Sequence, residues 1–517
     1  MGWFGKKDQA VTVDVTGASF ELDLPEHAMP FVTPGLERDD TFASGAVLAA
    51  KAKAFDDGLY AAVELAAQRG LGAIGGKAKL LERALTELGG DGDARTVVEA
   101  AAILGGVRPG GSPSAEAEVR AFLESPLRSK PLGFYTWSAE LARIFRQDRM
   151  LQTDIADASD RAALAAVLEG DPTYARYLGL VEKLTNPLSC ADLRPGRDGD
   201  VVAMLPPSIA HETELVKRLF GDRPIPEGFD LAKALTDAIR AGTIDLTPKA
   251  ASGWYDVQTW ALETLAAPER ALEAKKLRLE TRYREHLDAL FRAILAVTRE
   301  THVNQLEMPP AGAAMRTPNK VVVRPELHVE PLPTYYLRRA ESYRFVRGLL
   351  AAAFGEPALG HLQRVRASGP VGVDLRTELD SMIALFEGAA ATAMRDLGLP
   401  TDRDPAPYTA WLAEEDADLA EDRRMMVPVF YDVARRKTKV WVILGWSRTW
   451  LLARFVDPPR VTSADGAPVE VELETAGFPL PSLHVAEVYV SELLDRDQFR
   501  AHCDKYRTPE AILAALR

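Results

Sequence analysis

One stretch of the sequence gathers side-chain types that transfer protons or ligate metal ions. His302 precedes a linker rich in Pro and Gly, and Glu326, His328 and Glu330 follow that linker at alternate positions. Imidazole nitrogens and carboxylate oxygens bind divalent cations, and the same groups act as general acids and bases. We therefore predict that these residues form a functional site.

The position of His302 depends on a long helix predicted over residues 272–307. Its apolar side chains recur with the spacing of a buried helix face, at Tyr283, Leu287, Leu290, Phe291, Ile294 and Leu295. Continued at about 100° per residue, the same face turns polar at Thr298, Thr301, His302 and Gln305. We expect His302 to face the interior, where a polar group needs a partner from the protein, water, a ligand or a metal.

Beyond the linker the chain reads as an extended segment. Side chains alternate in such a segment, so we expect Glu326, His328 and Glu330 to share one face. A helix is predicted next, and its Arg338 or Arg339 could orient an anionic substrate. The catalytic candidates are His302, His328, Glu330 and Arg339, and the metal-ligand candidates are His302, His328, Glu326 and Glu330.

A divalent metal ion is the expected cofactor. The linker over residues 308–319 extends up to roughly 3.3 Å per residue, enough for the His328 segment to fold back beside the helix end. The C-terminus of a helix carries partial negative charge, which together with the nearby glutamates favours a cation. We therefore rank a metal above an anion as the ligand shared by His302 and His328.

The same residues also fit a purely structural interpretation. A single histidine on a helix face is more often a core residue with protein partners than a ligand, and alternating Glu and His also suit an exposed strand face. Residues 335–339, Tyr-Tyr-Leu-Arg-Arg, are equally typical of a packing helix. Residues 70–75 match the dinucleotide-binding pattern GxGxxG, but a helical sequence precedes them where that pattern requires a strand, so a helix–Gly–helix connection is favoured.

The elements that must position these residues indicate a mainly α protein with a β-rich C-terminal domain, of the α+β class. Alternating residues at 11–15 and 20–24 predict an N-terminal β-hairpin, and Ala/Leu-rich sequence then predicts a multi-helical body. From about residue 425 alternating β-branched and aromatic residues predict strands, closed by a C-terminal helix. The expected units are 1–40 (hairpin), 41–310 (helical body), 311–417 (a strand followed by helices packed on the body) and 418–517 (β-rich domain).

Composition excludes several classes of protein. The 517 residues carry 62 Lys and Arg against 75 Asp and Glu, a net charge of −13, which argues against general binding to nucleic acid or anionic membranes. With only Cys190 and Cys503, a disulfide framework and a structural zinc ribbon are excluded. No apolar run is long enough to span a bilayer, and no targeting segment is evident, so a soluble cytoplasmic protein is expected.

Two functions fit this sequence. The first is a cytoplasmic enzyme, a metal-assisted hydrolase acting on a small polar or anionic substrate, with the site at His302 and His328. The second is a non-catalytic helical scaffold that uses residues 418–517 as an adaptor for a protein partner. The two differ in whether His302, His328, Glu326 and Glu330 share one ligand.

Overall fold

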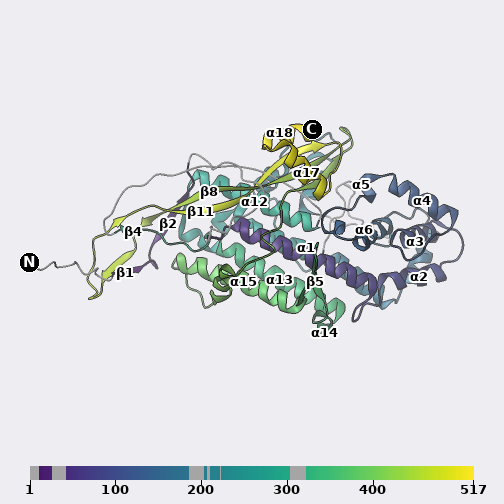
Figure 1. Cartoon of the computed structure of the whole chain (residues 1–517), viewed down its shortest axis with the longest axis horizontal. Helices are drawn as coiled ribbons and strands as arrows, with labels where there is room; N and C mark the ends of the chain where they lie inside the picture. The colour runs from purple at the N-terminus through teal and green to yellow at the C-terminus, as the bar shows by residue number, and fades with distance from the viewer. Residues whose placement is uncertain are drawn as a thin grey trace, which may run out of the picture.

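Figure 1 shows a computed structural model of the chain, an elongated molecule whose helical body is crossed by a long ribbon of strands. The structure describes residues 11–25, 42–184, 203–205, 210–221, 223–226, 228–302 and 322–517. The α-helices are α1 Gly45–Arg69, α2 Lys77–Glu87, α3 Asp93–Leu104, α4 Pro113–Leu123, α5 Pro126–Ser129, α6 Ala139–Leu151, α7 Ala158–Leu168, α8 Pro172–Leu184, α9 His211–Phe220, α10 Leu231–Arg240, α11 Trp254–Ala266, α12 Thr281–His302, α13 Pro333–Phe354, α14 Glu356–Leu359, α15 Leu375–Asp396, α16 Ala406–Ala413, α17 Arg496–Tyr506 and α18 Pro509–Leu516. The strands are β1 Val11–Asp14, β2 Ser19–Asp23, β3 Leu277–Leu279, β4 Val322–Val323, β5 Gln363–Arg366, β6 Gly369–Asp374, β7 Met425–Asp432, β8 Lys437–Asp457, β9 Arg460–Ser463, β10 Glu472–Leu473 and β11 Ala476–Val490.

Helix α1 lies at the centre of the helical body, and most of its residues are buried (Figure 1). Ser44 caps its start, with Oγ accepting a hydrogen bond from the Val47 N–H at 3.2 Å. Its end is capped by Gly70, and α2 follows shortly afterwards, so the predicted helix–Gly–helix connection is confirmed. Gly58 allows β5 to approach the helix, because a Cβ there would collide with the carbonyl oxygen of Val365.

The central strand of the main sheet is β8, which pairs with β7, β11 and β2. β7 and β8 form the predicted antiparallel hairpin, with Asp432 opposite Lys437. β11 runs antiparallel along β8, with one irregularity between His484 and Val485. The prediction of strands beyond about residue 425 is confirmed, and the fold is α+β.

Two strands flank the predicted N-terminal turn, and each takes its partner from a distant part of the chain. β1 pairs antiparallel with β9, which places Val11 opposite Ser463. β2 lies between β8 and β3, with Phe20 opposite both Phe455 and Leu277. β2 therefore belongs to the main sheet with β8 and β11, whereas β1 and β9 form a separate two-stranded sheet.

Helix α12 carries the predicted buried face. It begins at Thr281 instead of residue 272, because residues 277–279 form β3 and pair with β2. The six apolar residues of the predicted face are all buried, and the polar last turns are buried with them. His302 is 1% exposed, so its predicted interior position is confirmed. Gln305 and Glu307 lie outside the described residues.

One hydrophobic core joins the helical body to the C-terminal sheet. It contains Phe55 of α1 and Phe291 of α12 together with Trp441 and Val442 of β8. Because these side chains belong to one cluster, the β-rich part packs directly on the helices. The boundaries predicted at 40, 310 and 417 stay predictions.

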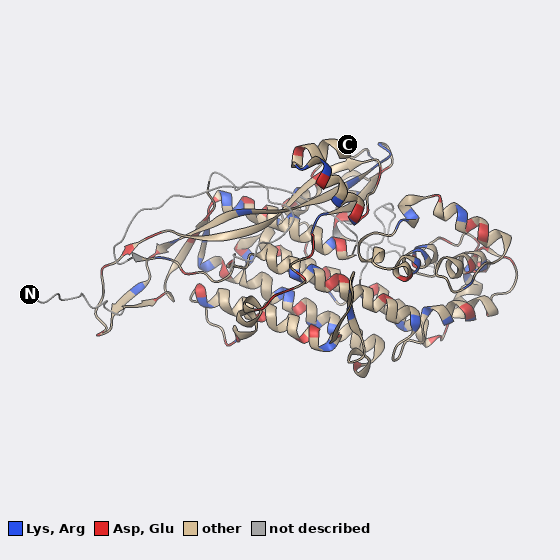
Figure 2. Ribbon diagram, in the orientation of Figure 1, with Lys and Arg blue, Asp and Glu red and all other residues tan. Residues whose placement is uncertain are grey.

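The surface carries charges of both signs. Figure 2 shows acidic and basic residues interspersed along the helices, while much of the long β8–β11 ribbon carries no charged residue. Mixed charges of this kind create no large field of one sign. Among the described helices, none combines the length and the apolar character needed to cross a membrane.

Candidate functional site

His302 ends α12 inside a chain of protein hydrogen bonds. Its Nδ1 lies 2.6 Å from the hydroxyl of Tyr60, and its Nε2 lies 2.8 Å from Oε1 of Gln258. The Gln258 amide donates in turn to Asp56 Oδ2 at 2.8 Å. The rings of Tyr60 and Trp254 pack around the imidazole, with centroids 5.0 and 5.4 Å away. Both ring nitrogens therefore contact protein groups, which satisfies a buried histidine without a metal.

Arg339 is also buried, and Asp56 is its counter-ion. Its Nη2 donates to Asp56 Oδ2 at 3.1 Å and to the Tyr343 hydroxyl at 2.9 Å, while Tyr343 donates to Asp56 Oδ1 at 2.9 Å. Burial raises the pKa of Asp56, and the positive charge of Arg339 opposes that rise. Arg339 therefore neutralises a buried carboxylate, and it does not line the open cleft described below.

Glu330 departs from the face predicted for it. It is fully buried, and its Oε2 accepts a hydrogen bond from the Gly45 N–H at 2.7 Å, at the start of α1. Its Oε1 accepts a hydrogen bond from the Tyr283 hydroxyl at 3.0 Å and lies 2.8 Å from His286 Nε2. A carboxylate at a helix N-terminus satisfies free N–H groups and interacts favourably with the helix dipole. The structure thus gives Glu330 a capping role.

The extended segment before Glu330 alternates as predicted. Arg324, Glu326 and His328 are exposed, and the residues between them are buried. Glu326 and His328 therefore share the predicted face, and Arg324 joins them. Glu330 breaks the alternation and turns inward beside Val329, which forms an isolated parallel bridge with Ala43 just before α1.

His328 forms a dyad with Asp396, the last residue of α15. His328 Nδ1 lies 2.8 Å from Asp396 Oδ1, and the His328 backbone N–H donates to Asp396 Oδ2 at 2.7 Å. The hydrogen bond to Asp396 raises the pKa of the His328 imidazole, and partial burial opposes this rise. Burial raises the pKa of Asp396, while the hydrogen bonds from His328 oppose that change. The carboxylate fixes the orientation of the ring, as the orienting acid does in catalytic dyads.

The second ring nitrogen of His328 is accessible. The side chain is 58% exposed, and Nε2 lies 3.7 Å from Glu326 Oε1, beyond hydrogen-bond distance. His328 and Asp396 line a cleft of about 780 Å³ together with Arg324, Glu326 and Arg395. The described residues that line this cleft include no Ser, Thr, Cys or Lys. The side chains that can transfer a proton there are His328, Asp396 and Glu326.

The four predicted metal ligands occupy different surroundings. Glu326 and His328 lie together in the cleft, whereas His302 and Glu330 have separate sets of interior partners. Within the part of the chain that the structure describes, no group of three or more His, Cys, Asp and Glu side chains could hold a metal ion. Metal binding at these four residues stays a prediction, and the hydrogen bonds of His302 and Glu330 do not favour it.

The structure adds residues that the sequence pattern did not single out. Asp396 and Arg395 reach the cleft from α15, far from His328 in sequence. Neither follows a recognisable motif, because a dyad needs only two side chains brought together by the fold. A carboxylate in the last turn of a predicted helix is a weak signal, since helix ends are often charged.

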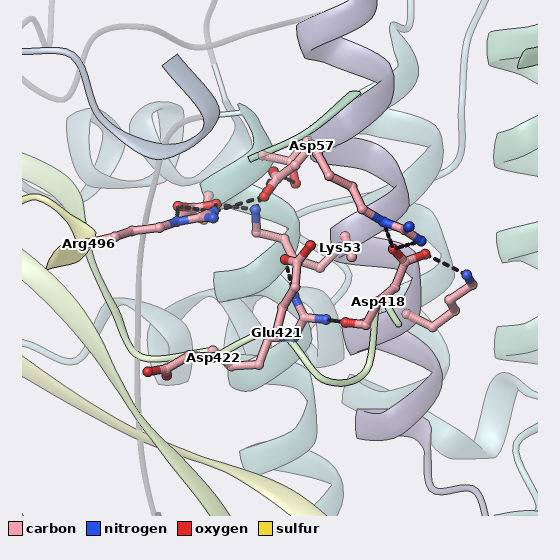
Figure 3. Close-up of polar contacts among 12 residues, drawn as sticks. Lys53, Asp57, Asp418, Glu421, Asp422 and Arg496 are labelled. Atoms are coloured by element: carbon pink, nitrogen blue, oxygen red, sulfur yellow. Dashed lines mark hydrogen bonds and ion pairs between the residues drawn. The ribbon is translucent and has the colours of Figure 1, made fainter. Parts of the chain in front are cut away.

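A buried ionic cluster was likewise not predicted. Figure 3 shows its first half, where Lys53 forms ion pairs with Asp57 and Glu300. Arg496, from the start of α17, contacts Asp57 Oδ2 at 2.8 Å and Glu300 Oε1 at 2.9 Å. Burial would raise the pKa of Asp57, but Lys53 and Arg496 outweigh it and lower that pKa. The cluster joins α1, α12 and α17.

The second half of the cluster surrounds Asp418, which is fully buried (Figure 3). Its carboxylate lies 2.6 Å from Lys51 Nζ, 3.1 Å from Arg364 Nη2 and 2.7 Å from Arg366 Nη2. Burial opposes ionisation, yet Lys51 and Arg364 hold the pKa of Asp418 well below its ordinary value. These charges compensate one another, so the cluster fastens residues 414–424 to α1 and β5.

Comparisons with known proteins add no function. No family model matches the sequence, and neither the curated proteins nor the solved structures give a match. A function for this chain therefore rests on the chemistry of the His328 cleft.

Proposed function

We propose that this protein is an enzyme that hydrolyses a small anionic substrate in the cleft lined by His328 and Asp396. The observation that carries the proposal is the 2.8 Å contact between His328 Nδ1 and Asp396 Oδ1 at the wall of an open cleft. A histidine held by a carboxylate and open at its other nitrogen has the arrangement of a general base. A cytoplasmic location and a small-molecule substrate are parts of the same proposal.

Water supplies the nucleophile in this proposal. The described lining residues offer no hydroxyl, thiol or amine side chain, so a covalent intermediate on one of those groups is not expected. His328 Nε2 takes a proton from water as the water oxygen bonds to the acyl carbon, and the carbonyl electron pair moves to oxygen. When that pair returns, the bond to the leaving group breaks and the leaving group takes the proton from Nε2. The products are a carboxylic acid and an alcohol or amine.

The two arginines of the cleft hold the negative charge of the substrate. Arg324 comes from the extended segment that also carries His328, and Arg395 precedes Asp396 at the end of α15. A guanidinium group keeps its charge at any physiological pH and matches a carboxylate in shape. Arg324 and Arg395 thus take the clamp role predicted for Arg338 or Arg339. Arg338 instead contacts Glu263 at 2.8 Å.

The experiment is an ester hydrolysis assay on the full chain. We expect faster turnover of 4-nitrophenyl glutarate, which carries a free carboxylate, than of the neutral 4-nitrophenyl butyrate. His328→Gln should lower kcat/KM by about 10²–10⁴-fold, the usual contribution of a general base. His361→Gln, at another exposed histidine, is the control and should leave kcat/KM unchanged.

Two results would overturn the proposal. One is the absence of turnover above the buffer rate with both esters. The other is an equal rate for the wild-type chain and His328→Gln, which would leave the histidine without a catalytic role.

A further inference from the structure

The His328 cleft is lined by apolar side chains as well as by charged ones. The apolar side chains contributed by the strands are called the apolar wall. This wall is formed by Val11 and Val13 of β1, Phe20 of β2, Phe455 of β8 and Phe478 of β11. The charged residues come from elsewhere, from the segment before Glu330 and from the end of α15. One cleft therefore presents both ionic groups and hydrocarbon to a ligand.

The apolar wall is fixed by strand pairing. The β1–β9 and β2–β8 ladders hold its strands, and the rings of Phe20 and Phe455 lie 5.1 Å apart. Val11 and Val13 remain 36% and 39% exposed, so part of this wall is open to a ligand. Large apolar side chains exposed beside charged groups are typical of sites for ligands of mixed polarity.

We infer that the ligand of this cleft is an amphiphilic carboxylate, an anionic head group attached to a hydrocarbon chain. Arg395 and Arg324 would hold the head group, and the chain would lie along Val13 and Phe455. The inference rests on the proposed function, because the head group is the negative charge that Arg324 and Arg395 hold on the proposed anionic substrate. It adds that the substrate has an apolar part.

Charge and hydrophobic burial together favour an amphiphilic carboxylate over a short carboxylate and over a neutral alcohol. Asp396 is engaged by His328, so the two guanidinium groups of Arg324 and Arg395 share the cleft with one remaining carboxylate, that of Glu326. Each methylene group moved from water to an apolar surface strengthens binding several-fold. A short carboxylate gains only the ionic contacts, and a neutral alcohol gains only the apolar ones.

The test is calorimetric titration of the full chain with acetate, octanoate and 1-octanol. We expect octanoate to bind at least tenfold more tightly than acetate and than 1-octanol. Val13→Ser should weaken octanoate at least threefold and leave acetate unchanged. Val373→Ser is the matched control, because this valine is also exposed, at 41%, but lies in β6 outside the cleft.

Arg395→Gln tests the other end of the ligand and should weaken both carboxylates but not 1-octanol. Equal affinity for acetate and octanoate, with both weakened by Arg395→Gln, would overturn the amphiphilic ligand and leave the proposed anion site standing. Octanoate and 1-octanol binding equally, with no effect of Arg395→Gln, would overturn the amphiphilic ligand and the anion site together. If octanoate does not bind, the inference is wrong. The proposed hydrolysis is then tested by the ester assay alone.

Discussion

The backbone N–H of Gly45 donates to Glu330 Oε2 at 2.7 Å, so this carboxylate caps the central helix. The two residues lie on α1 and on the segment that also carries His328. Glu330 therefore ties the wall of the cleft to the buried centre of the helical body. Glu330 is therefore a positioning residue, which holds the segment that carries His328 against the start of α1.

Replacing Glu330 tests this capping role. Glu330→Gln removes the negative charge at the start of α1 and disturbs the hydrogen bonds of Tyr283 and His286. We expect a loss of about 1–3 kcal/mol in the free energy of unfolding, measured by urea titration. Glu326→Gln is the control, because that side chain is 83% exposed and its loss should leave stability unchanged. Equal stabilities for the two variants would contradict the capping role.

The ionic cluster should make stability depend on Asp418 and on pH. Asp418→Asn removes the common counter-ion of the buried Arg364 and of the partly exposed Lys51 and Arg366. We expect the free energy of unfolding to fall by about 3 kcal/mol at pH 7. Since the folded-state pKa of Asp418 is depressed, its contribution is present above the unfolded value of about 4 and declines as pH falls towards the folded value. The difference in the free energy of unfolding between the wild type and Asp418→Asn should thus be about 1 kcal/mol smaller at pH 3 than at pH 7.

Urea titrations at both pH values measure that gap. Asp402→Asn is the matched control, because this side chain is 98% exposed. A gap that widens on acidification would contradict the assignment of Asp418 as an ionised, paired carboxylate.

His484 should add a second acid-sensitive contribution in a higher pH range. Burial lowers the pKa of His484 to about 3, whereas a histidine in the unfolded chain titrates near 6.5. Below about pH 6.5 the histidine is protonated in the unfolded state but stays neutral in the folded state. The free energy of unfolding therefore falls as pH drops below about 6.5. The free energy of unfolding should be about 2 kcal/mol lower at pH 5 than at pH 7.5.

His484→Gln removes this titration and should flatten the pH dependence of the unfolding free energy between pH 7.5 and 5. His361→Gln, at an exposed histidine, should retain the wild-type slope. A His484→Gln variant that loses as much stability as the wild type over this range would contradict the burial of a neutral imidazole.

Local patterns predicted much of the fold. The β7–β8 hairpin, the buried face of α12 and the interior position of His302 all follow from the period of apolar residues within one element. Alternation likewise predicted that Glu326 and His328 share an exposed face. These features depend on residues close together in the sequence, so the spacing of apolar and polar residues is enough to predict them.

Long-range contacts were beyond those patterns. Nothing in the β1 sequence names β9 as its partner, since pairing depends on the whole topology of the sheet. Asp396 reaches His328 for the same reason, by the packing of α15 against the extended segment. Glu330 broke the alternation because the free N–H groups of α1 require an acceptor, a demand made by another element.

The pH dependence of ester hydrolysis tests the central claim, that His328 is a general base oriented by Asp396, most directly. A base acts as neutral imidazole, and the hydrogen bond to Asp396 raises the pKa of His328, so kcat/KM of the wild type should rise with pH and level off only above about 6.5. In Asp396→Asn the midpoint should move down towards 6.5, and the plateau should fall at least tenfold. An unchanged midpoint in Asp396→Asn, or a pH profile of the wild type that matches that of His328→Gln, would contradict the account and leave a non-catalytic scaffold as the better description of this chain.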